Sequence, residues 1–282
     1  MPFTKMEGLG NDYVYINVFD TPIKNPAPLA IKISDRNFGV GGDGLVLIGP
    51  SQKADFRMRM FNADGSEGEM CGNAIRCVGK YLYERGLTAK EQLAIETLAG
   101  LRFLHLQISG GKVTLVRVNM GEPEFVPAAI PMRLPAAYTN NNFINQAVAL
   151  DGQSYLGTAV SMGNPHLVIP LPDIDALDLP VLGPKFEHHE FFPARVNTEF
   201  IEVISKTHVR MRVWERGSGE TLACGTGACA VLAACVANKL TERRADIELR
   251  GGTLLIEWGS DNIIYMTGPA TEVFSGVFTV RA

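Results

Sequence analysis

The sequence has no excess of basic residues, since 26 Lys and Arg stand against 30 Asp and Glu for a net charge of −4. A nucleic-acid-binding surface needs clustered Lys and Arg, so this balance argues against that class of protein. The longest apolar run, Ala228–Ala237, is well short of the ~18 residues that a membrane span needs. The opening residues, MPFTKMEGLGNDY, lack the pattern of a secretory signal peptide. We therefore expect a soluble cytoplasmic protein with no nucleic-acid or membrane partner.

Cysteine is scarce, and its spacing excludes two common uses. Five cysteines are an odd number in a chain of 282 residues, which is not the pattern of a disulfide framework. No CxxC or paired Cys/His spacing occurs, and the adjacent His188 and His189 would point apart on a helix or a strand. The sequence therefore predicts no metal site. The cysteines occupy positions 71, 77, 224, 229 and 235.

The sequence contains an internal repeat. FRMRMFNADGSEGEMCGN (56–73) aligns with VRMRVWERGSGETLACGT (209–226) at an offset of 153 residues without a gap. The same offset places the Gly-Asn pair at 10–11 on the pair at 163–164, and IETLAG resembles IELRGG after a small indel. Two copies are too few for a solenoid, which needs about three stacked units. The constant register instead predicts two similar lobes.

Each copy of the repeat alternates short strands with one clear helix. VYINVF, LVLIG, FRMRMF, RFLHLQI and KVTLVRVNM have the apolar content or the period-two alternation of strands. Apolar residues follow Cys71 at helical spacing as far as Gly86, and the run after Cys224 is apolar nearly all round, as in a buried helix. We therefore expect an α/β (α+β) fold in which each lobe is a mixed sheet around a central helix.

Cys71 and Cys224 occupy equivalent positions, each directly before a predicted helix. A helix start has unpaired N–H groups and a partial positive charge, which bind anions and favour ionisation of a thiol. The glycines that follow, Gly72 and Gly225, allow a ligand to approach the backbone closely.

Two such helix starts facing one cleft could hold the carboxylate of a small amino-acid substrate between two sulfurs. One sulfur would remove the α-proton as a thiolate, and the other would return a proton to the opposite face. Because like charges oppose each other, the two thiols should not both be ionised. The pattern predicts a racemase or epimerase that needs no cofactor. The remaining cysteines, Cys77, Cys229 and Cys235, are predicted to be small core residues.

Motifs along nearly the whole chain resemble the diaminopimelate epimerase family. They are GLGNDY, GVGGDG, FNADGSE, CGNAIRC, VNMGEP, SMGNPH, RVNTEF, WERGSGET, ACGTGA and YMTGPA. The resemblance implies two pseudo-symmetric lobes, each with a β-barrel-like mixed sheet around its helix. Residues 1–120 plus 269–282 would form the lobe with Cys71, and residues 121–268 the lobe with Cys224. It also implies interconversion of LL- and meso-diaminopimelate without pyridoxal phosphate, in lysine and peptidoglycan biosynthesis, usually by a homodimer.

The resemblance also implies roles for individual residues. Cys71 and Cys224 resemble the catalytic base and acid, and His166 and Glu215 match groups that tune the thiols. Gly72-Asn73 and Gly225-Thr226 resemble the cradle of the reacting carboxylate. We expect Arg216, which can bind a carboxylate bidentately, to recognise the distal amino-acid group. The predicted substrate-binding residues are Asn11, Asn62, Gly72, Asn73, Asn164, Asn197, Glu215, Arg216, Gly225 and Thr226.

Gly44 is a weaker candidate for a substrate contact. The repeat places it opposite Asn197, and some family members carry Gln at this position whereas others carry Gly. A glycine could contribute only its backbone there.

Three alternative functions fit part of the pattern. Proline racemases and hydroxyproline epimerases look similar and use two cysteines, but their first motif usually has His where this chain has Asn73. A non-enzymatic amino-acid-binding protein with structural thiols would lack thiols that react rapidly with iodoacetamide. An isomerase of the phenazine-biosynthesis type shares the architecture without the paired cysteines.

Overall fold

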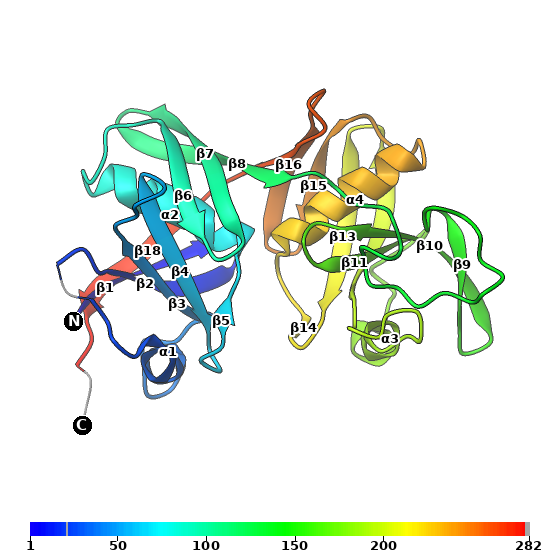
Figure 1. Ribbon diagram of the computed structural model, residues 1–282, viewed down its shortest axis with the longest axis horizontal. Helices are drawn as coiled ribbons and strands as arrows, with labels where there is room; N and C mark the ends of the chain where they lie inside the picture. Colours follow the sequence, from blue (N-terminus) through cyan, green and yellow to red (C-terminus); the bar gives the residue numbers. More distant parts are fainter. Residues whose placement is uncertain (21, 280–282) are drawn as a thin grey trace. The chain divides into compact units, whose positions relative to one another are not determined.

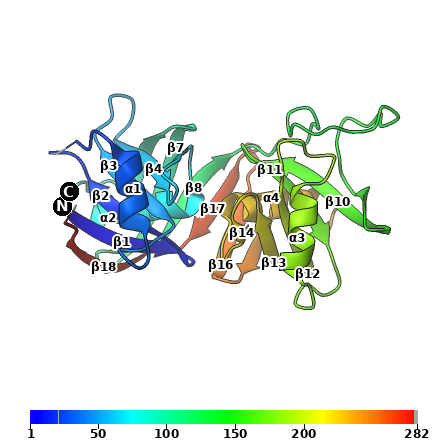
Figure 2. The same ribbon diagram turned by 90° about the horizontal axis from the view of Figure 1, so that it is seen from below.

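The computed structural model describes residues 1–20 and 22–279, which form two compact units. Unit 1 comprises Met1–Asn119 and Thr267–Ala282, and unit 2 comprises Met120–Met266. The chain therefore leaves the first unit, builds the second, and returns to the first with its last strand (Figures 1 and 2). Within the described residues, no helix has both the length and the apolar character required to cross a membrane.

Unit 1 is a mixed sheet with two helices. Its strands pair in the order β18, β1, β2, β3, β4, β6, β7, β8, with β5 forming a short hairpin against β4. The pairs β2–β3 and β4–β6 are parallel and the others antiparallel. The elements are β1 (Pro2–Gly8), β2 (Asn11–Asn17), α1 (Pro26–Ser34), β3 (Gly44–Gly49), β4 (Phe56–Asn62), β5 (Glu67–Gly68), α2 (Gly72–Glu84), β6 (Gln92–Thr97), β7 (Gly100–Ser109), β8 (Lys112–Gly121) and β18 (Thr271–Val277).

Unit 2 repeats this plan. Its strands pair in the order β9, β10, β11, β12, β13, β15, β16, with β14 forming a hairpin against β13 and with β11–β12 and β13–β15 parallel. The elements are β9 (Gln146–Leu150), β10 (Gln153–Ser161), β11 (Pro165–Pro170), α3 (Leu179–Glu187), β12 (Asn197–Ser205), β13 (His208–Glu215), β14 (Gly219–Glu220), α4 (Gly225–Ala237), β15 (Arg244–Leu249), β16 (Gly252–Trp258) and β17 (Ile264–Gly268).

The structure confirms the duplication residue by residue. Helices α3 and α4 have the bounds of α1 and α2 displaced by 153 positions (26 to 179 and 72 to 225 at their starts). The parallel strand pairs share a register as well, because Tyr13 pairs with Gly44 as His166 pairs with Asn197. After α2 and α4 the offset changes by one residue, which is the indel that the sequence indicates.

Each sheet curves around its central helix, as expected for a barrel-like lobe. Helix α2 packs against β1 and β2, near one end of the pairing order of unit 1, and against β7, near the other end. Helix α4 packs likewise against β10, β11, β12, β15 and β16. Only a curved sheet brings strands so distant in order onto one helix. Both helices are consequently rich in fully buried residues.

The cysteines on these helices behave as predicted. Cys77, Cys229 and Cys235 are fully buried among apolar side chains. Burial raises the pKa of Cys77 and of Cys235 to about 12, because a thiolate is costly in an apolar interior. These thiols stay protonated and serve as small core residues. All five cysteines of the chain are free.

Candidate active site

Cys71 and Cys224 are the N-cap residues of α2 and α4. Both have extended backbone, with φ −131° and ψ 120° at Cys71 and φ −124° and ψ 107° at Cys224. The first intrahelical bonds are donated by Ile75 and Ala228, so the N–H groups of the preceding residues point out of the helix starts. Both helices therefore begin where the sequence predicts, with a thiol beside outward-pointing N–H groups.

In unit 1 the sulfur contacts a hydrogen-bonded chain that leads away from the helix. Cys71 Sγ lies 3.3 Å from Asn11 Oδ1, which accepts the thiol hydrogen. Asn11 Nδ2 donates in turn to Asp43 Oδ2 over 2.7 Å, and Arg36 donates to Asp43 Oδ1 over 3.0 Å. Since both ends of the Asn11 amide are engaged, its orientation beside the sulfur is fixed.

Two carboxylates support this chain and differ in their pKa values. Burial and the nearby charge of Asp12 raise the pKa of Asp43. Burial acts in the same direction on Asp12, but its bonds to Arg36 and Lys5 outweigh burial and lower the pKa of Asp12. The pair therefore keeps a negative charge at Asp12, balanced by two cations.

Unit 1 also holds a buried cation close to Cys71. Arg76, on α2, is fully buried and donates to Pro269 O, Gly72 O and Asn73 Oδ1 at 3.0, 3.2 and 2.9 Å. Burial lowers the pKa of Arg76, whereas attraction to the thiol groups of Cys77 and Cys71 acts against it. The Asn73 amide oxygen accepts from Arg76 and is therefore engaged within unit 1.

In unit 2 the sulfur accepts bonds from its own helix start. Cys224 Sγ accepts from Gly227 N over 3.3 Å and lies 3.6 Å from Thr226 Oγ1. Asn164 Nδ2 donates to Thr226 Oγ1 over 3.3 Å, and Asn164 Oδ1 lies 3.0 Å from His166 Nε2. These predicted site residues therefore form one connected group around the thiol.

Carboxylates dominate the surroundings of this second thiol. Burial, followed by the charges of Glu215 and Glu199, raises the pKa of Cys224 well above its ordinary value. Burial also raises the pKa of Glu215, whose carboxylate accepts from Thr221 Oγ1. The helix start alone led us to expect easier ionisation at both sulfurs. At Cys224, burial and two neighbouring carboxylates work in the opposite direction and favour the protonated thiol.

The residues predicted to hold the distal part of a substrate lie at strand ends. Asn197 begins β12, and its buried Oδ1 accepts from Arg216 N over 2.9 Å. The Arg216 side chain is exposed and donates to Ala194 O over 3.3 Å. Asn62 ends β4 and is exposed, and its amide donates to Ser66 Oγ over 3.0 Å rather than to another predicted site residue.

Gly44 leaves no room for a side chain. A Cβ at this position would lie 2.1 Å from Phe61 O and 2.7 Å from the Tyr13 ring. The glutamine that some family members carry would therefore require the neighbouring strands to move. In this chain only the backbone of Gly44 is available.

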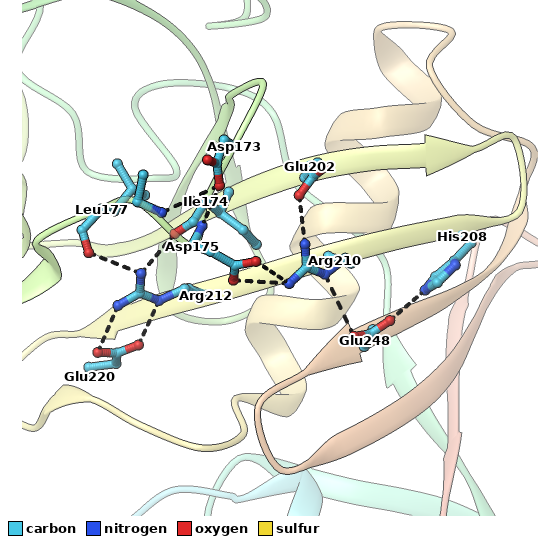
Figure 3. A network of polar contacts seen from close by, with 11 residues as sticks. Asp173, Ile174, Asp175, Leu177, Glu202, His208, Arg210, Arg212, Glu220 and Glu248 are labelled. Carbon is cyan, nitrogen blue, oxygen red and sulfur yellow. Dashed lines mark hydrogen bonds and ion pairs between the residues drawn. The ribbon is translucent and has the colours of Figure 1, made fainter.

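A second polar group lies on the outer face of the unit 2 sheet and has a different character (Figure 3). Arg210 pairs with Asp175 and Glu202, and Arg212 pairs bidentately with Glu220. Each arginine labelled there is paired with at least one acidic side chain of the same network. It ties the loop before α3 to β13 and contains no residue of the predicted site. Among the described residues, no group of three His, Cys, Asp or Glu side chains is arranged to hold a metal ion.

Comparison with known proteins decides the family. The family model described as diaminopimelate epimerase matches residues 3–126 and 158–273. The diaminopimelate epimerase of Desulfovibrio desulfuricans is 58% identical over 281 residues, covering 99% of this chain and 98% of the relative. That of Acetivibrio thermocellus is 56% identical over 277 residues, covering 98% of each. The chain belongs to the diaminopimelate epimerase family. It is accordingly an isomerase, which excludes the non-enzymatic binding protein.

Solved structures of more distant proteins share the fold. A phenazine biosynthesis protein of the PhzF family from Bacillus anthracis has a TM-score of 0.71 at 19% identity, covering 100% of this chain and 99% of that protein. A hydroxyproline epimerase from Agrobacterium vitis, with bound trans-4-hydroxy-L-proline, has a TM-score of 0.67 at 15% identity and covers 98% and 90%. Identities this low establish the architecture and no more.

Three charged residues next to the thiols carried no predicted role. Arg76 and Asp43 lie inside the quoted motifs CGNAIRC and GVGGDG, and Glu199 lies inside RVNTEF. For Arg76 and Glu199 a signal was available, because a charge within an apolar helix or strand is rarely buried without a partner. Asp43 offered none, since aspartate is common in glycine-rich loops.

Proposed function

We propose that this protein interconverts LL- and meso-diaminopimelate by proton transfer between two cysteines, without a cofactor, in lysine and peptidoglycan biosynthesis. Membership of the family supports the substrate. The observation that carries the mechanism is the equivalence of Cys71 and Cys224. Each is the N-cap residue of the corresponding helix in its own copy of the repeat. We also propose that the protein acts as a homodimer in the cytoplasm. Sedimentation of the purified protein measures its oligomeric state.

The proposed site binds the reacting carboxylate on the N–H groups of the two helix starts. Gly72 and Asn73 provide them on α2, and Gly225 and Thr226 on α4. These donors are fixed before the substrate arrives, so they can stabilise the extra charge that develops on the carboxylate when the α-proton leaves. Small residues at the first helical position let the substrate approach closely.

The proposed proton transfers assign different starting states to the sulfurs. Cys71, whose thiol donates to Asn11 Oδ1 in this structure, is proposed to lose that hydrogen to solvent near the buried Arg76 and, as the thiolate, to take the α-proton from one face. Cys224, whose pKa is raised by burial and by Glu215 and Glu199, starts as the thiol and gives its proton to the other face. The turnover leaves Cys71 as thiol and Cys224 as thiolate, the form from which the reverse reaction begins.

Specificity for a long substrate is proposed to come from residues that the repeat does not conserve. Asn62 and Ala63 correspond to Glu215 and Arg216 at the offset of 153. The reacting carbon has nearly equivalent faces, whereas the distal end of the substrate contacts one set of groups only. An exposed guanidinium at Arg216 can bind the distal carboxylate bidentately, with Asn11, Asn164 and Asn197 holding the rest.

The direct test uses the purified protein with three substrates: LL-diaminopimelate, L-proline and trans-4-hydroxy-L-proline. Inversion of LL-diaminopimelate alone is the expected result, measured by chiral chromatography without added cofactor. Arg216→Lys keeps the charge but loses bidentate geometry, so discrimination against simple amino acids should weaken. Faster inversion of proline than of LL-diaminopimelate would refute the proposed function.

A further inference from the structure

Glu199 is an acidic residue in the buried part of a strand, between Thr198 and Phe200. Its side chain is completely buried in β12, and its Oε1 lies 2.7 Å from His166 Nδ1 on the neighbouring strand β11. Its other oxygen, Oε2, has no hydrogen-bond partner among the described residues. The repeat places Val46 and Tyr13 at the equivalent positions of unit 1, so this acid–imidazole pair exists in unit 2 only. A buried pair of this kind costs free energy, which directs attention to what it holds in place.

The pair is the far end of a continuous hydrogen-bonded chain that reaches Cys224. From Glu199 the chain passes to His166 over 2.7 Å, and from His166 Nε2 to Asn164 Oδ1 over 3.0 Å. Asn164 Nδ2 then donates to Thr226 Oγ1 over 3.3 Å, and that hydroxyl lies 3.6 Å from Cys224 Sγ. All five residues belong to unit 2, and four of them, all except Glu199, are predicted site residues.

The direction of the chain depends on its acidic end. A carboxylate can only accept, so His166 must donate through Nδ1. With Nδ1 held on Glu199, the other ring nitrogen, Nε2, faces Asn164 Oδ1 at 3.0 Å, and the Asn164 amide nitrogen faces Thr226. The carboxylate of Glu199 therefore sets which ring nitrogen faces Asn164, and through it the placement of the Asn164 amide.

Helix α4 is shaped to admit Glu199. A Cβ at Gly227 would lie 2.7 Å from Glu199 Oε1 and 3.1 Å from Cys224 Sγ. The equivalent residue of unit 1 is Ala74, opposite Val46. Unit 2 therefore differs from unit 1 at both members of this contact, with a longer side chain on the strand and a smaller one on the helix.

We propose that Glu199 is a positioning residue that holds the His166 ring with Nδ1 toward its carboxylate and Nε2 toward Asn164, and thereby places the Asn164 amide and the Thr226 hydroxyl beside Cys224. This inference rests on the proposed function for its catalytic consequence, but the orientation itself does not. The titratable groups that face His166 and Cys224 in unit 2 are Glu199 and Glu215, and both belong to the described chain.

The test compares Glu199→Gln with Glu202→Gln. Glu202 lies on the same strand β12 but pairs with Arg210 in the outer network of Figure 3, so its variant loses the same charge away from the thiol. In the wild type and in Glu202→Gln, nitrogen NMR of labelled histidine should show the same His166 signal, with a proton on Nδ1, assigned by its loss in His166→Asn. In Glu199→Gln the His166 signal should change, because no carboxylate confines the proton to Nδ1, and kcat/KM should fall about tenfold or more, as for other groups that orient a functional side chain.

Each outcome separates the two claims. An unchanged His166 signal in Glu199→Gln overturns the positioning role whatever the activity. A changed signal in a protein that inverts no diaminopimelate supports the positioning role and refutes the proposed function. Should Glu199→Gln fail to fold, Glu199→Asp keeps the carboxylate on a shorter side chain, and it should keep the proton on Nδ1 with a smaller loss of kcat/KM. A wild-type ring with its proton on Nε2 alone would also overturn the inference.

Discussion

At the scale of single residues, the two thiols have the same backbone position and different electrostatic surroundings. Arg76 lies fully buried near Cys71, whereas the equivalent residue in unit 2 is Cys229. Cys224 is surrounded by Glu215 and Glu199 and has a raised pKa. The repeat gives both sulfurs the same position at a helix start, and the substitutions within it distinguish their surroundings.

This difference predicts unequal alkylation by iodoacetamide, which requires the thiolate. Cys71 is partly exposed and should react at neutral pH, while Cys224 is buried and should react only at pH values above the ordinary thiol range. Glu215→Gln removes one of the charges that raise the pKa of Cys224, so its labelling should begin at lower pH. Mass spectrometry of the labelled peptides measures both, with the buried Cys77 as an unreactive control. Rapid labelling of Cys224 at neutral pH in the unaltered protein would contradict the assignment.

A second residue-scale prediction concerns Gly227. Replacing glycine by alanine inside a helix normally stabilises it by roughly 0.5–1 kcal/mol. Here the added Cβ would lie 2.7 Å from a Glu199 oxygen, so one side chain must move. Gly227→Ala should therefore lower both the melting temperature and kcat. A rise in melting temperature with unchanged kcat would contradict the close contact between position 227 and the Glu199 carboxylate.

At the scale of elements, the starts of α2 and α4 are the part of the proposed site that the backbone alone provides. Thr226→Pro removes one N–H donor at a helical position where proline is sterically tolerated, and Thr226→Ala removes the hydroxyl while keeping that N–H. A preorganised oxyanion donor is worth about 3–4 kcal/mol, or roughly 10²–10³ in kcat. Thr226→Pro should lose about that much more than Thr226→Ala in steady-state assays. Equal kcat values for the two variants would show that the Thr226 N–H does not stabilise the transition state.

The sequence predicts the elements around the thiols well, because the same local pattern occurs in both copies of the repeat. The starts of α2 and α4 follow from a cysteine, a glycine and a helical run in both copies. Helices α1 and α3 have no such signal. Their sequences, PAPLAIKIS and LPVLGPKFE, contain prolines, which are more typical of loops. Tertiary packing against β3 and β4, and against β12 and β13, determines them instead.

The surroundings of the thiols were less predictable than their positions. Nothing in the local pattern indicates that Glu199 lies against Gly227 or that Asp43 holds the Asn11 amide, because both contacts join residues distant in sequence. The raised pKa of Cys224 depends on that packing too. Sequence reasoning identified the sulfurs and the helix starts, while the fold determines which charges face them.

At the scale of the whole molecule, the buried structural thiols predict loss of stability at alkaline pH. Cys77 and Cys235 have pKa values raised from 9.0 to about 12, so the folded state retains protons that the unfolded chain releases. Their contribution is complete below about pH 9 and is lost as the pH rises toward 12, at about 1.4 kcal/mol per pH unit for each thiol.

Urea unfolding between pH 8.5 and 11 measures this loss. Both Cys77→Ala and Cys235→Ala lose a constant amount of stability through the cavity, but each should show a shallower fall of unfolding free energy with pH than the unaltered protein. Parallel curves for the variants and the unaltered chain would mean that these thiols are not held protonated. The other titrating groups are common to all three proteins and cancel in the comparison.

The account depends most on the action of two sulfurs on opposite faces of one carbon. Its most direct test follows LL-diaminopimelate in heavy water by proton NMR and chiral chromatography at early conversion. The two-cysteine mechanism predicts deuterium at the inverted carbon of meso-diaminopimelate and almost none in the remaining LL substrate. Neither meso product nor its deuterium signal should form with Cys71→Ala or Cys224→Ala. Product that keeps its original hydrogen, or deuterium appearing equally in substrate and product from the start, would contradict it.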